Sequence, residues 1–352
     1  MIVLPYLDHV PQLGPNQTSD EWVTVIGRTE IGAGCHFGKL ATLRGDGEDI
    51  RVGADCWFGE ASTVHIADSI FGASVGSHVT VGRFGLVHAC KIGDHCVLGE
   101  NAVVMDNSEV GPGAVIAAES VVPPGKTLAG GWLYAGTPAR PVEQISPARV
   151  AELHESIRNS AMIDNADIIR AKTPVGEFRR PPGTGVDDFA SDDSYIAPTA
   201  SVTGNLKLAP HSSVWFAVEI DAQGATVEVG EASNIQDNSR IHLEAGETMR
   251  IGRRVTVGHN VRMYACEIED EAIIGMGCIV GKGTIVRKGG VIAAGAVTAP
   301  GTEVAAGTIW AGQPARRSRP LSEENARFFS MGVDVYKRYT AVYRAAQKAG
   351  QG

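Results

Sequence analysis

The chain is poor in aromatic residues, in long apolar stretches and in positive charge. Aromatic residues make up 6% of the 352 residues, and the formal net charge is −9 at pH 7. No apolar run approaches the roughly 20 residues that a membrane-spanning helix requires. Because affinity for nucleic acid is mostly cationic, the acidic balance argues against a nucleic-acid partner. We therefore expect a soluble protein that acts on a small molecule, without nucleic-acid or membrane partners.

Paired cysteines are also absent. The chain has six cysteines, none in a Cys-Xaa-Xaa-Cys arrangement, and each lies in an apolar, strand-like stretch. This pattern predicts buried free thiols in a reducing compartment rather than disulfides. The first six residues lack the basic stretch that opens a secretory signal, so a cytoplasmic location is the expectation. The cysteines are Cys35, Cys56, Cys90, Cys96, Cys266 and Cys278.

Glycine, in contrast, is abundant and recurs at a fixed period. Many of the 43 glycines follow an aliphatic residue at multiples of about six residues, as in Ile31-Gly32, Val52-Gly53 and Val257-Gly258. This period matches neither a helix nor a simple alternating strand, but it suits a coil of three short strands. Glycine at the corners would tolerate the positive φ of a tight turn. The pattern predicts a left-handed parallel β-helix, because an antiparallel sandwich would not keep this register for so long.

A second, longer period indicates that the β-helix is duplicated. The segment Trp132–Arg140 recurs as Thr308–Arg316, and Val87-His88-Ala89-Cys90 matches Met263-Tyr264-Ala265-Cys266. The two copies span roughly residues 20–145 and 193–318. The shared Gly-Xaa-Pro-Ala-Arg endings are interpreted as structure that terminates each coil.

A helix is predicted after each copy. The stretches from residue 146 to about 172 and from 321 to about 348 each open with a serine-containing start signal. In the second stretch, apolar residues recur at helical spacing and predict a buried face. These residues are Phe328, Val335, Tyr339 and Tyr343.

The predicted organisation is all-β dominated, with two tandem β-helices that are each followed by an α-helix. The segment between the copies contains Pro181-Pro182-Gly183 and several acidic residues, which are typical of a linker. We therefore assign residues 1–172 to the first β-helix and its helix, 173–192 to the linker, and 193–352 to the second β-helix and its helix.

Histidines at matching positions of the two copies are candidate metal ligands. Each copy keeps two histidines of a possible three, and the lost positions do not coincide. A metal site assembled between the copies would therefore still have three histidines. The matched pairs are His65 with His242, Arg83 with His259, and His88 with Tyr264.

Several motifs resemble those of the gamma-class carbonic anhydrases and their relatives. The resemblance covers both β-helices and the helices that follow them. The hexapeptide pattern alone is shared with many acyltransferases, whereas Asn-Ile-Gln-Asp followed by spaced histidines is more specific. The motifs are Leu43-Arg44-Gly45-Asp46 and Val87-His88-Ala89-Cys90 in the first copy, and Ser213-Val214-Trp215-Phe216, Ser233-Asn234-Ile235-Gln236-Asp237, Ile241-His242 and Val257-Gly258-His259 in the second.

The resemblance implies an oligomer of β-helices with zinc, or another divalent metal such as Fe2+ or Co2+, held between neighbours. In that family one β-helix gives the first and third histidines and its neighbour gives the middle one. Applied to this chain, the rule selects His65, His88 and His259 as metal ligands. A fourth position would be left for water, whose pKa the metal would lower to about 7 to generate hydroxide. The sequence leaves open which copies meet in the expected homo-oligomer.

The opposite combination is predicted to hold no metal. There His242 would face Tyr264 and Arg83. A guanidinium has no lone pair to offer and stays cationic, and a neutral tyrosine is a poor ligand at pH 7.

Other family positions divide between the copies in the same way. The first copy keeps Arg44 and Asp46, and the second keeps Asn234, Gln236 and Asp237. The resemblance implies that Arg44 pairs with Asp237 and that Gln236 orients the metal-bound water or the substrate. The residues at the altered positions are Ile220 and Ala222 in the second copy, and Trp57, Gly59 and Glu60 in the first.

The predicted function is a metal-dependent lyase in which hydroxide attacks carbon dioxide, or a related enzyme acting on another carbonyl or thioester carbon. One alternative is a CoA-dependent acyltransferase without metal, in which His65 or His88 acts as a lone base. A second is a non-catalytic scaffold subunit. Six histidines are expected to be solvated and without a role, namely His9, His36, His78, His95, His154 and His211.

Overall fold

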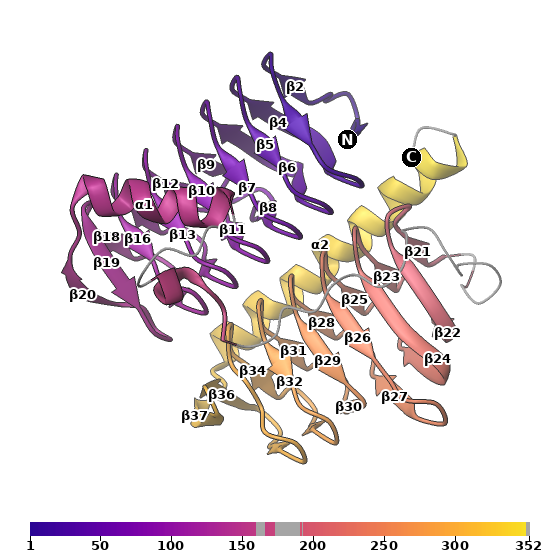
Figure 1. Cartoon of the computed structure of the whole chain (residues 1–352). Coiled ribbons are helices and arrows are strands. Elements are labelled where there is room, and N and C mark those ends of the chain that lie inside the picture. The colour runs from indigo at the N-terminus through magenta and orange to yellow at the C-terminus, as the bar shows by residue number, and fades with distance from the viewer. Residues whose placement is uncertain (160–165, 173–190, 192, 350–352) are drawn as a thin grey trace. The chain divides into compact units, whose positions relative to one another are not determined.

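Parallel strands wind into a separate coil in each half of the chain, and one α-helix follows each coil (Figure 1). The computed structural model describes residues 1–159, 166–172, 191 and 193–349. Its two units are Met1–Glu177 and Phe178–Gly352. The predicted tandem β-helices with trailing helices are thus confirmed. The linker assigned to residues 173–192 lies, apart from residue 191, outside the described residues.

Unit 1 contains two sheets. The 12-stranded sheet consists of β1 (Ile2–Leu4), β2 (Gln12–Leu13), β4 (Thr24–Ile31), β6 (Thr42–Val52), β8 (Thr63–His65), β9 (Ala73–Val75), β11 (Leu86–His88), β12 (Lys91–Ile92), β14 (Val103–Val104), β15 (Glu109–Val110), β17 (Val121–Val122) and β18 (Thr127–Leu128). The 8-stranded sheet consists of β3 (Thr18–Ser19), β5 (His36–Phe37), β7 (Trp57–Phe58), β10 (Thr80–Val81), β13 (Val97–Leu98), β16 (Val115–Ile116), β19 (Trp132–Ala135) and β20 (Arg140–Gln144).

Unit 2 repeats this arrangement. Its 8-stranded sheet consists of β21 (Tyr195–Ile196), β23 (Ser213–Val214), β25 (Asn234–Ile235), β28 (Thr256–Val257), β31 (Ile273–Ile274), β34 (Val291–Ile292), β36 (Thr308–Gly312) and β37 (Ala315–Pro320). Its 9-stranded sheet consists of β22 (Ser201–Leu208), β24 (Glu219–Val229), β26 (Arg240–His242), β27 (Thr248–Ile251), β29 (Arg262–Tyr264), β30 (Glu267–Ile268), β32 (Ile279–Val280), β33 (Ile285–Val286) and β35 (Glu303–Val304), and β22 joins it through β24.

The larger sheet of each unit bends around one corner of its coil. In unit 1, Thr42–Arg44 of β6 pairs with β8, whereas Ile50–Val52 of the same strand pairs with β9. In unit 2, β24 pairs with β26 through Glu219–Asp221 and with β27 through Thr226–Val229. One long strand therefore serves two faces of the coil, and the 8-stranded sheet forms the third face.

The core is a set of aliphatic stacks along the axis of each coil. Inward-facing residues of successive coils lie in register and are at most 1% exposed, so each contributes about 1.5–3 kcal/mol of burial. One stack in unit 1 is Val25, Leu43, Val64, Val87, Val104 and Val122. The matching stack in unit 2 is Val202, Ile220, Ile241, Met263 and Val280.

The recurring glycine has a different role from the one predicted. Gly32 does not take a positive φ, but a Cβ at this position would lie 2.6 Å from the carbonyl carbon of Gly53 on the next coil. The backbones of successive coils therefore approach too closely for a side chain. The positive-φ corners are taken by residues of other types, such as Asp55 at 55° and His78 at 58°, and by other glycines, such as Gly34 at 72°.

Helix α1 (Pro147–Arg158) follows the coil of unit 1. Ser146 caps it by accepting a hydrogen bond from the Arg149 amide, as the start signal predicted. Its buried residues Val150, Leu153 and Ile157 belong to one apolar cluster with strand residues of the 8-stranded sheet. The prediction that this helix reaches about residue 172 was wrong, because α1 ends at Arg158. A short 3-10 helix, η1 (Ala166–Ile169), lies further along.

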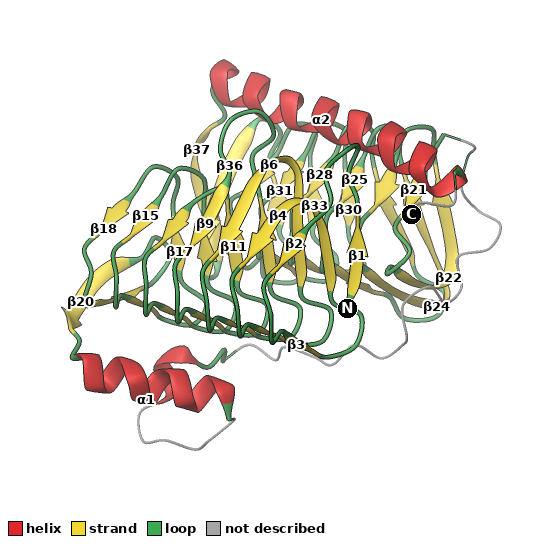
Figure 2. Cartoon of the chain, turned by 90° about the horizontal axis from the view of Figure 1, so that it is seen from above, coloured by secondary structure: helices red, strands yellow, loops and turns green. Residues whose placement is uncertain are grey.

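Helix α2 (Glu323–Lys348) follows the coil of unit 2 and contacts β21 and β23 (Figure 2). Ser322 caps it, and Val333, Tyr336, Tyr339 and Tyr343 are among its buried residues. Phe328 was predicted on the buried face, but its side chain is 52% exposed. The helix buries its apolar stripe against the sheet only beyond this residue.

The six cysteines are free and buried, which confirms the prediction of free thiols. Neither described helix is both long and apolar enough to cross a bilayer.

Candidate metal-binding site

Three polar side chains form a column on one face of unit 1. Arg44, His65 and His88 are register partners on β6, β8 and β11. Their neighbours Leu43 and Val64 point into the core. Because side chains alternate along a strand, the column projects away from the core. The coil thus brings together residues that are 21 and 23 positions apart in the sequence.

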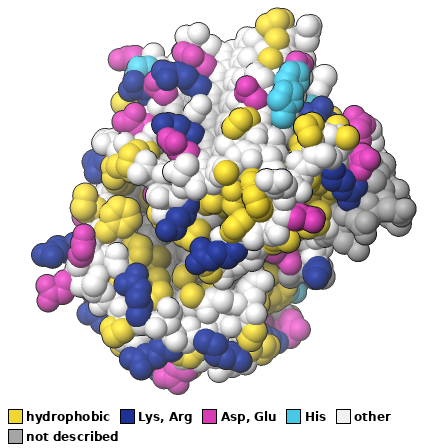
Figure 3. Space-filling view, turned by 90° about the vertical axis from the view of Figure 1, so that its left-hand side faces the viewer, with side chains coloured by type: hydrophobic (Ala, Val, Ile, Leu, Met, Phe, Trp, Pro, Cys, Tyr) yellow, Lys and Arg dark blue, Asp and Glu magenta, His cyan; other side chains and the backbone are white. Residues whose placement is uncertain are grey.

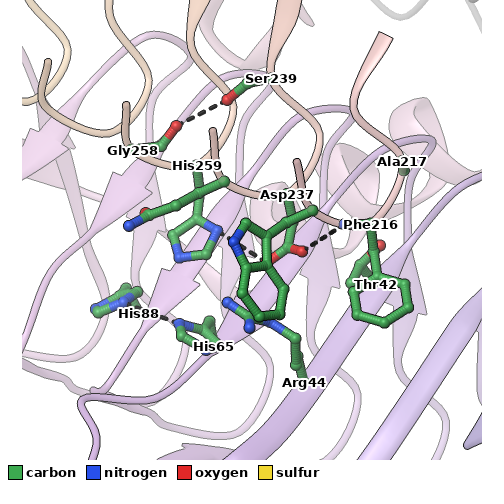
Figure 4. Close-up of polar contacts among 12 residues, drawn as sticks. Thr42, Arg44, His65, His88, Phe216, Ala217, Asp237, Ser239, Gly258 and His259 are labelled. Atoms are coloured by element: carbon green, nitrogen blue, oxygen red, sulfur yellow. Dashed lines mark hydrogen bonds and ion pairs between the residues drawn. The ribbon is translucent and has the colours of Figure 1, made fainter. Parts of the chain in front are cut away.

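Two histidine rings of this column face each other. The Nδ1 atom of His65 lies 3.3 Å from Nε2 of His88 (Figure 4). The other nitrogen of each ring contacts a carboxylate: Nε2 of His65 is 3.2 Å from Oδ1 of Asp46, and Nδ1 of His88 is 2.5 Å from Oδ1 of Asp106. A carboxylate behind an imidazole fixes its tautomer and orientation and makes the opposite nitrogen a better ligand.

This geometry fits a metal-ligand pair. Nitrogens that bind one tetrahedral zinc ion at about 2.0–2.1 Å lie about 3.3–3.4 Å apart. The separation between the facing nitrogens of His65 and His88 is 3.3 Å. Two lone pairs that face each other at this distance repel unless a proton or a metal ion lies between them. Unit 1 therefore supplies two preoriented nitrogen ligands suited to a divalent metal.

Asp46 links this pair to Arg44. The Nη1 atom of Arg44 donates to Oδ2 of Asp46 at 2.7 Å, and both side chains are fully buried. Oδ1 of the same carboxylate contacts His65. Asp46 therefore bridges a guanidinium and an imidazole, and the positive charge of Arg44 compensates the charge of this buried carboxylate.

Unit 2 contains a second group of predicted residues. The Nδ1 atom of His259 lies 3.1 Å from Oδ2 of Asp237, whose Oδ1 accepts a hydrogen bond from the Phe216 amide at 3.0 Å (Figure 4). His259 is 1% exposed. This carboxylate lies beside Nδ1 at ion-pair distance but outside hydrogen-bond geometry, which leaves the Nε2 atom of His259 as the nitrogen suited to a ligand.

Gln236 and Asn234 lie beside Asp237 on the same coil. The side-chain amide of Gln236 donates to Oδ1 of Asn234 at 3.1 Å. The Asn234 amide donates in turn to the hydroxyl of Thr256 on the next coil, also at 3.1 Å. This chain of hydrogen bonds fixes the orientation of both amides.

Two further residues of these networks were missed from the sequence. Asp106 contacts His88, and the Tyr336 hydroxyl on α2 lies 3.4 Å from Nε2 of His259. Asp106 follows His88 by 18 residues, one turn of the coil, so coil spacing was a usable signal for it. Tyr336 follows His259 by 77 residues on a helix, and no sequence spacing connects them.

The remaining matched residues form no histidine pair. His242 and Tyr264 are register partners, and Nδ1 of His242 is 3.0 Å from Oδ2 of Asp221. The Arg83 side chain in unit 1 contacts two carboxylates, Glu100 at 3.2 Å and Glu60 at 3.9 Å. The guanidinium thus already has its counter-charges. That this set binds no metal stays a prediction.

Strand register corrects one alignment between the copies. Arg44 was matched with Ile220, but the register partner of His242 on β24 is Asp221. Asp221 therefore occupies the position that Arg44 holds beside His65, and Ile220 points into the core. The positive charge of the first copy is replaced by a negative charge in the second, not by an apolar residue.

Within unit 1 the predicted residues Arg44, Asp46, His65 and His88 form one network. Asn234, Gln236, Asp237 and His259 lie together within unit 2. The predicted three-histidine set and the Arg44–Asp237 pair each combine residues of both units, so they stay predictions.

One histidine expected to be solvated is held in place instead. Nδ1 of His154 on α1 lies 2.7 Å from the Thr80 hydroxyl on β10, and Nε of Arg158 donates to the same oxygen at 3.1 Å. Burial, followed by the nearby Arg158 charge, lowers the pKa of His154 to about 4.

Comparison with known proteins agrees with these features. The model of the bacterial transferase hexapeptide (six repeats) matches residues 89–124. Gamma carbonic anhydrase 1, mitochondrial, of Arabidopsis thaliana is 35% identical over 182 residues, which cover 50% of this chain and 64% of that protein. A carbonic anhydrase of Geobacillus kaustophilus is 37% identical over 155 residues, which cover 44% of this chain and 85% of that protein.

A solved structure of a proposed acetyltransferase from Desulfovibrio desulfuricans G20 covers 95% of this chain with a TM-score of 0.50 and 12% identity, which shows a shared fold. The chain spans less than two thirds of the length of the Arabidopsis relative. The match to the Geobacillus protein, in contrast, covers most of that relative at 37% identity. The chain belongs to the gamma-carbonic-anhydrase-like family of hexapeptide-repeat proteins.

Proposed function

We propose that the protein is a metal-dependent enzyme of the gamma-carbonic anhydrase type, with one divalent metal held by His65, His88 and His259. Its reaction would be the hydration of carbon dioxide or a related attack on another carbonyl or thioester carbon. The observation that carries the proposal is the 3.3 Å separation between the facing nitrogens of His65 and His88. The similarity to carbonic anhydrases supports the reaction class.

The metal is proposed to be zinc, with Fe2+ or Co2+ as other ions that three imidazoles accept. When bound, it would lower the pKa of a water molecule to about 7 and so supply hydroxide at neutral pH. The third ligand would come from a second-copy β-helix, either of the same chain or of a neighbour in a homo-oligomer. The cytoplasmic location belongs to the same proposal.

The residues around the histidines have distinct proposed roles. Asp46, Asp106 and Asp237 orient the three rings through the contacts described above. Gln236, whose amide is fixed by Asn234, orients the attacking water or the substrate. Arg44 forms an ion pair with Asp46, and the predicted pairing of Arg44 with Asp237 would connect the two halves of the site.

Metal content of the purified protein tests this proposal. We expect about one metal ion per chain in the wild type and almost none in His259→Ala, because two imidazoles bind a divalent ion much more weakly than three. His242→Ala is the matched control, since it removes the corresponding histidine of the other set and leaves the proposed ligands intact. It should keep the metal.

Other outcomes would overturn the composite site. Two metal ions per chain would mean that the set with Arg83 and Tyr264 also binds. Loss of metal in His242→Ala but not in His259→Ala would mean that the ligands are wrongly assigned. No metal after growth with added zinc would favour the acyltransferase or the scaffold.

A further inference from the structure

The coil of unit 2 ends in an open sheet edge. β37 is the last strand of its sheet, and among the described residues β36 is its one strand partner. Residues 316–320 are all exposed. A free edge presents unpaired backbone N–H and C=O groups to any extended chain that comes alongside.

This edge strand has three arginines at exposed positions. Arg316 donates to its neighbouring carbonyl and Arg319 donates to Oδ1 of Asn325. In the part of the chain that the structure describes, no carboxylate lies within 4.0 Å of Arg316, Arg317 or Arg319. Most other arginines of unit 2 form ion pairs, such as Arg287 with Glu269 and Glu303. Three arginines without a carboxylate partner among the described residues are therefore unusual within this unit.

An exposed apolar stripe begins beside these arginines. Arg319 connects β37 to Asn325 in the first turn of α2 through a hydrogen bond of 3.3 Å. Phe328 and Met331 follow Asn325 at successive intervals of three residues, so they lie on the same side of the helix. Their side chains are 52% and 60% exposed. Figure 3 faces the side where Figure 1 draws β36 and β37, and its lower part shows several Lys and Arg side chains, with apolar and some acidic side chains among them.

The corresponding strand of unit 1 lacks this character. β20 also ends its sheet, but its sequence Arg-Pro-Val-Glu-Gln contains one arginine and one glutamate. The three cations are therefore a property of β37 and not a general requirement for terminating the coil.

We propose that β37 and the start of α2 form a docking surface for an acidic, extended peptide segment of another protein. The segment would add a strand to the free edge of β37 and place its carboxylates against Arg317 and Arg319. Apolar side chains of the same segment would cover Phe328 and Met331. None of these residues is a proposed metal ligand or contacts one in the interactions described above.

Charge and chemistry select this occupant over others. Main-chain pairing at a sheet edge accepts any extended sequence, so side chains must provide the specificity. Arginines on an edge discourage the addition of strands that do not compensate their charge, and an acidic strand is the kind that does so. Arginine forms two parallel hydrogen bonds with a carboxylate, and arginine, phenylalanine and methionine are enriched in protein interfaces.

Fluorescence anisotropy with synthetic peptides on the full chain tests this proposal. The probe is a labelled eight-residue peptide of alternating Glu and Val. We expect it to bind the wild-type protein, and to bind R317E/R319E at least tenfold more weakly. R140E is the matched control, because it reverses an arginine of the corresponding strand in unit 1, and it should leave the affinity unchanged. Both substitutions are at exposed positions, and circular dichroism would check that the variants fold.

Two control peptides separate the elements of the proposal. An alternating Lys–Val peptide should not bind the wild type, and a Glu–Val peptide with alternate backbone amides methylated should lose affinity because it cannot pair with the edge. Equal binding of either control, or an affinity that does not change in R317E/R319E, would overturn the docking site. Binding to phosphatidylserine vesicles but not to the peptide would assign the arginines to lipid. Self-association that disappears in R317E/R319E would show that a second copy covers this face.

Discussion

At the scale of single residues, each histidine of the two matched sets has a carboxylate behind its ring. The pairs are His65 with Asp46, His88 with Asp106, His259 with Asp237, and His242 with Asp221. A carboxylate alone therefore does not distinguish the proposed site. The distinguishing feature is the neighbouring register partner, which is a second imidazole 3.3 Å away for His65. For His242 it is the Tyr264 ring, which lies edge-on at 6.4 Å between centroids.

The role of Asp106 can be tested by removing its charge. We expect Asp106→Asn to weaken metal binding by about 10–100-fold, because the amide no longer fixes the tautomer and orientation of His88. Competition against a chelating dye would measure the dissociation constant. Asp221→Asn is the control, since it makes the same change behind His242. Equal losses in both variants would contradict a role specific to the metal centre.

The sequence identified most of the site residues but not their supports. Repeat matching identified the histidines, and the resemblance suggested Arg44, Asp46, Asn234, Gln236 and Asp237. Tyr336 lies on a helix whose docking no periodicity specifies. Arg44 was matched with Ile220 because one copy has one residue more than the other, which shifts the sequence alignment by one position. Strand register avoids this error because it depends only on which residues are paired.

At the scale of elements, α2 is anchored by an aromatic cluster. Trp215 is fully buried and contacts the rings of Tyr336, Tyr339 and Tyr343 at 5.2 Å, 6.1 Å and 5.2 Å between centroids. Since Tyr336 also contacts His259, the cluster connects helix docking to the candidate ligand.

Truncating the tryptophan should destabilise this anchor strongly. We expect Trp215→Ala to lower the free energy of unfolding by about 3–5 kcal/mol, because it leaves a large cavity beneath α2. Urea denaturation would measure the change. Trp22→Ala, at a position that is 36% exposed, should cost less than about 1 kcal/mol. Similar losses in the two variants would show that the aromatic cluster is not the anchor.

Helix α1 depends on pH through His154. In the folded chain the pKa of His154 is lowered to about 4, first by burial and then by Arg158. The unfolded chain binds this proton below its ordinary pKa of about 6.5, whereas the folded chain does not bind it until about pH 4. Stability is therefore unaffected by His154 above pH 6.5 and falls as the pH drops from 6.5 toward 4.

The variant His154→Gln should remove this dependence. When the pH is lowered from 7.5 to 4.5, we expect the free energy of unfolding to fall by roughly 2 kcal/mol more in the wild type than in the variant. This value allows for a smaller effect of the His154 pKa shift because the side chain is partly exposed to solvent. Urea denaturation at the two pH values would measure the difference. A constant gap between variant and wild type would show that His154 titrates normally.

At the scale of the whole molecule, duplication has produced two units with the same fold and different chemistry. Unit 1 has an imidazole pair at the position where unit 2 has His242 and Tyr264, and unit 2 has His259 where unit 1 has Arg83. Each unit alone thus has an incomplete ligand set. The proposed single metal per chain follows from this asymmetry.

The asymmetry can be reversed by two substitutions. In the double variant Arg83→His/Tyr264→His we expect the metal content to rise from one to two ions per chain, because both sets then contain three imidazoles. Elemental analysis by mass spectrometry would measure it. Each single variant should stay near one ion, since its second set still lacks one ligand. If the double variant also stays at one ion, the face of the first copy that contains Arg83 does not meet the face of the second copy that contains His242 and Tyr264.

The sequence by itself determined the repeat, the duplication, the trailing helices and the candidate histidines, because these depend on local periodicity that needs no partner. It misjudged the recurring glycines, the length of α1, the burial of Phe328 and the solvation of His154. Each of these properties depends on contacts with residues of a neighbouring coil or helix that are distant in the sequence.

Only the tertiary structure decided which nitrogen of His65 faces His88 and which carboxylate lies behind each ring. The physical reason is that a β-helix stacks residues about 18 or more positions apart at one strand spacing of about 4.8 Å. Every extra residue in a turn of the coil changes which later residues stack on one another, and the repeat pattern alone does not show where these extra residues lie.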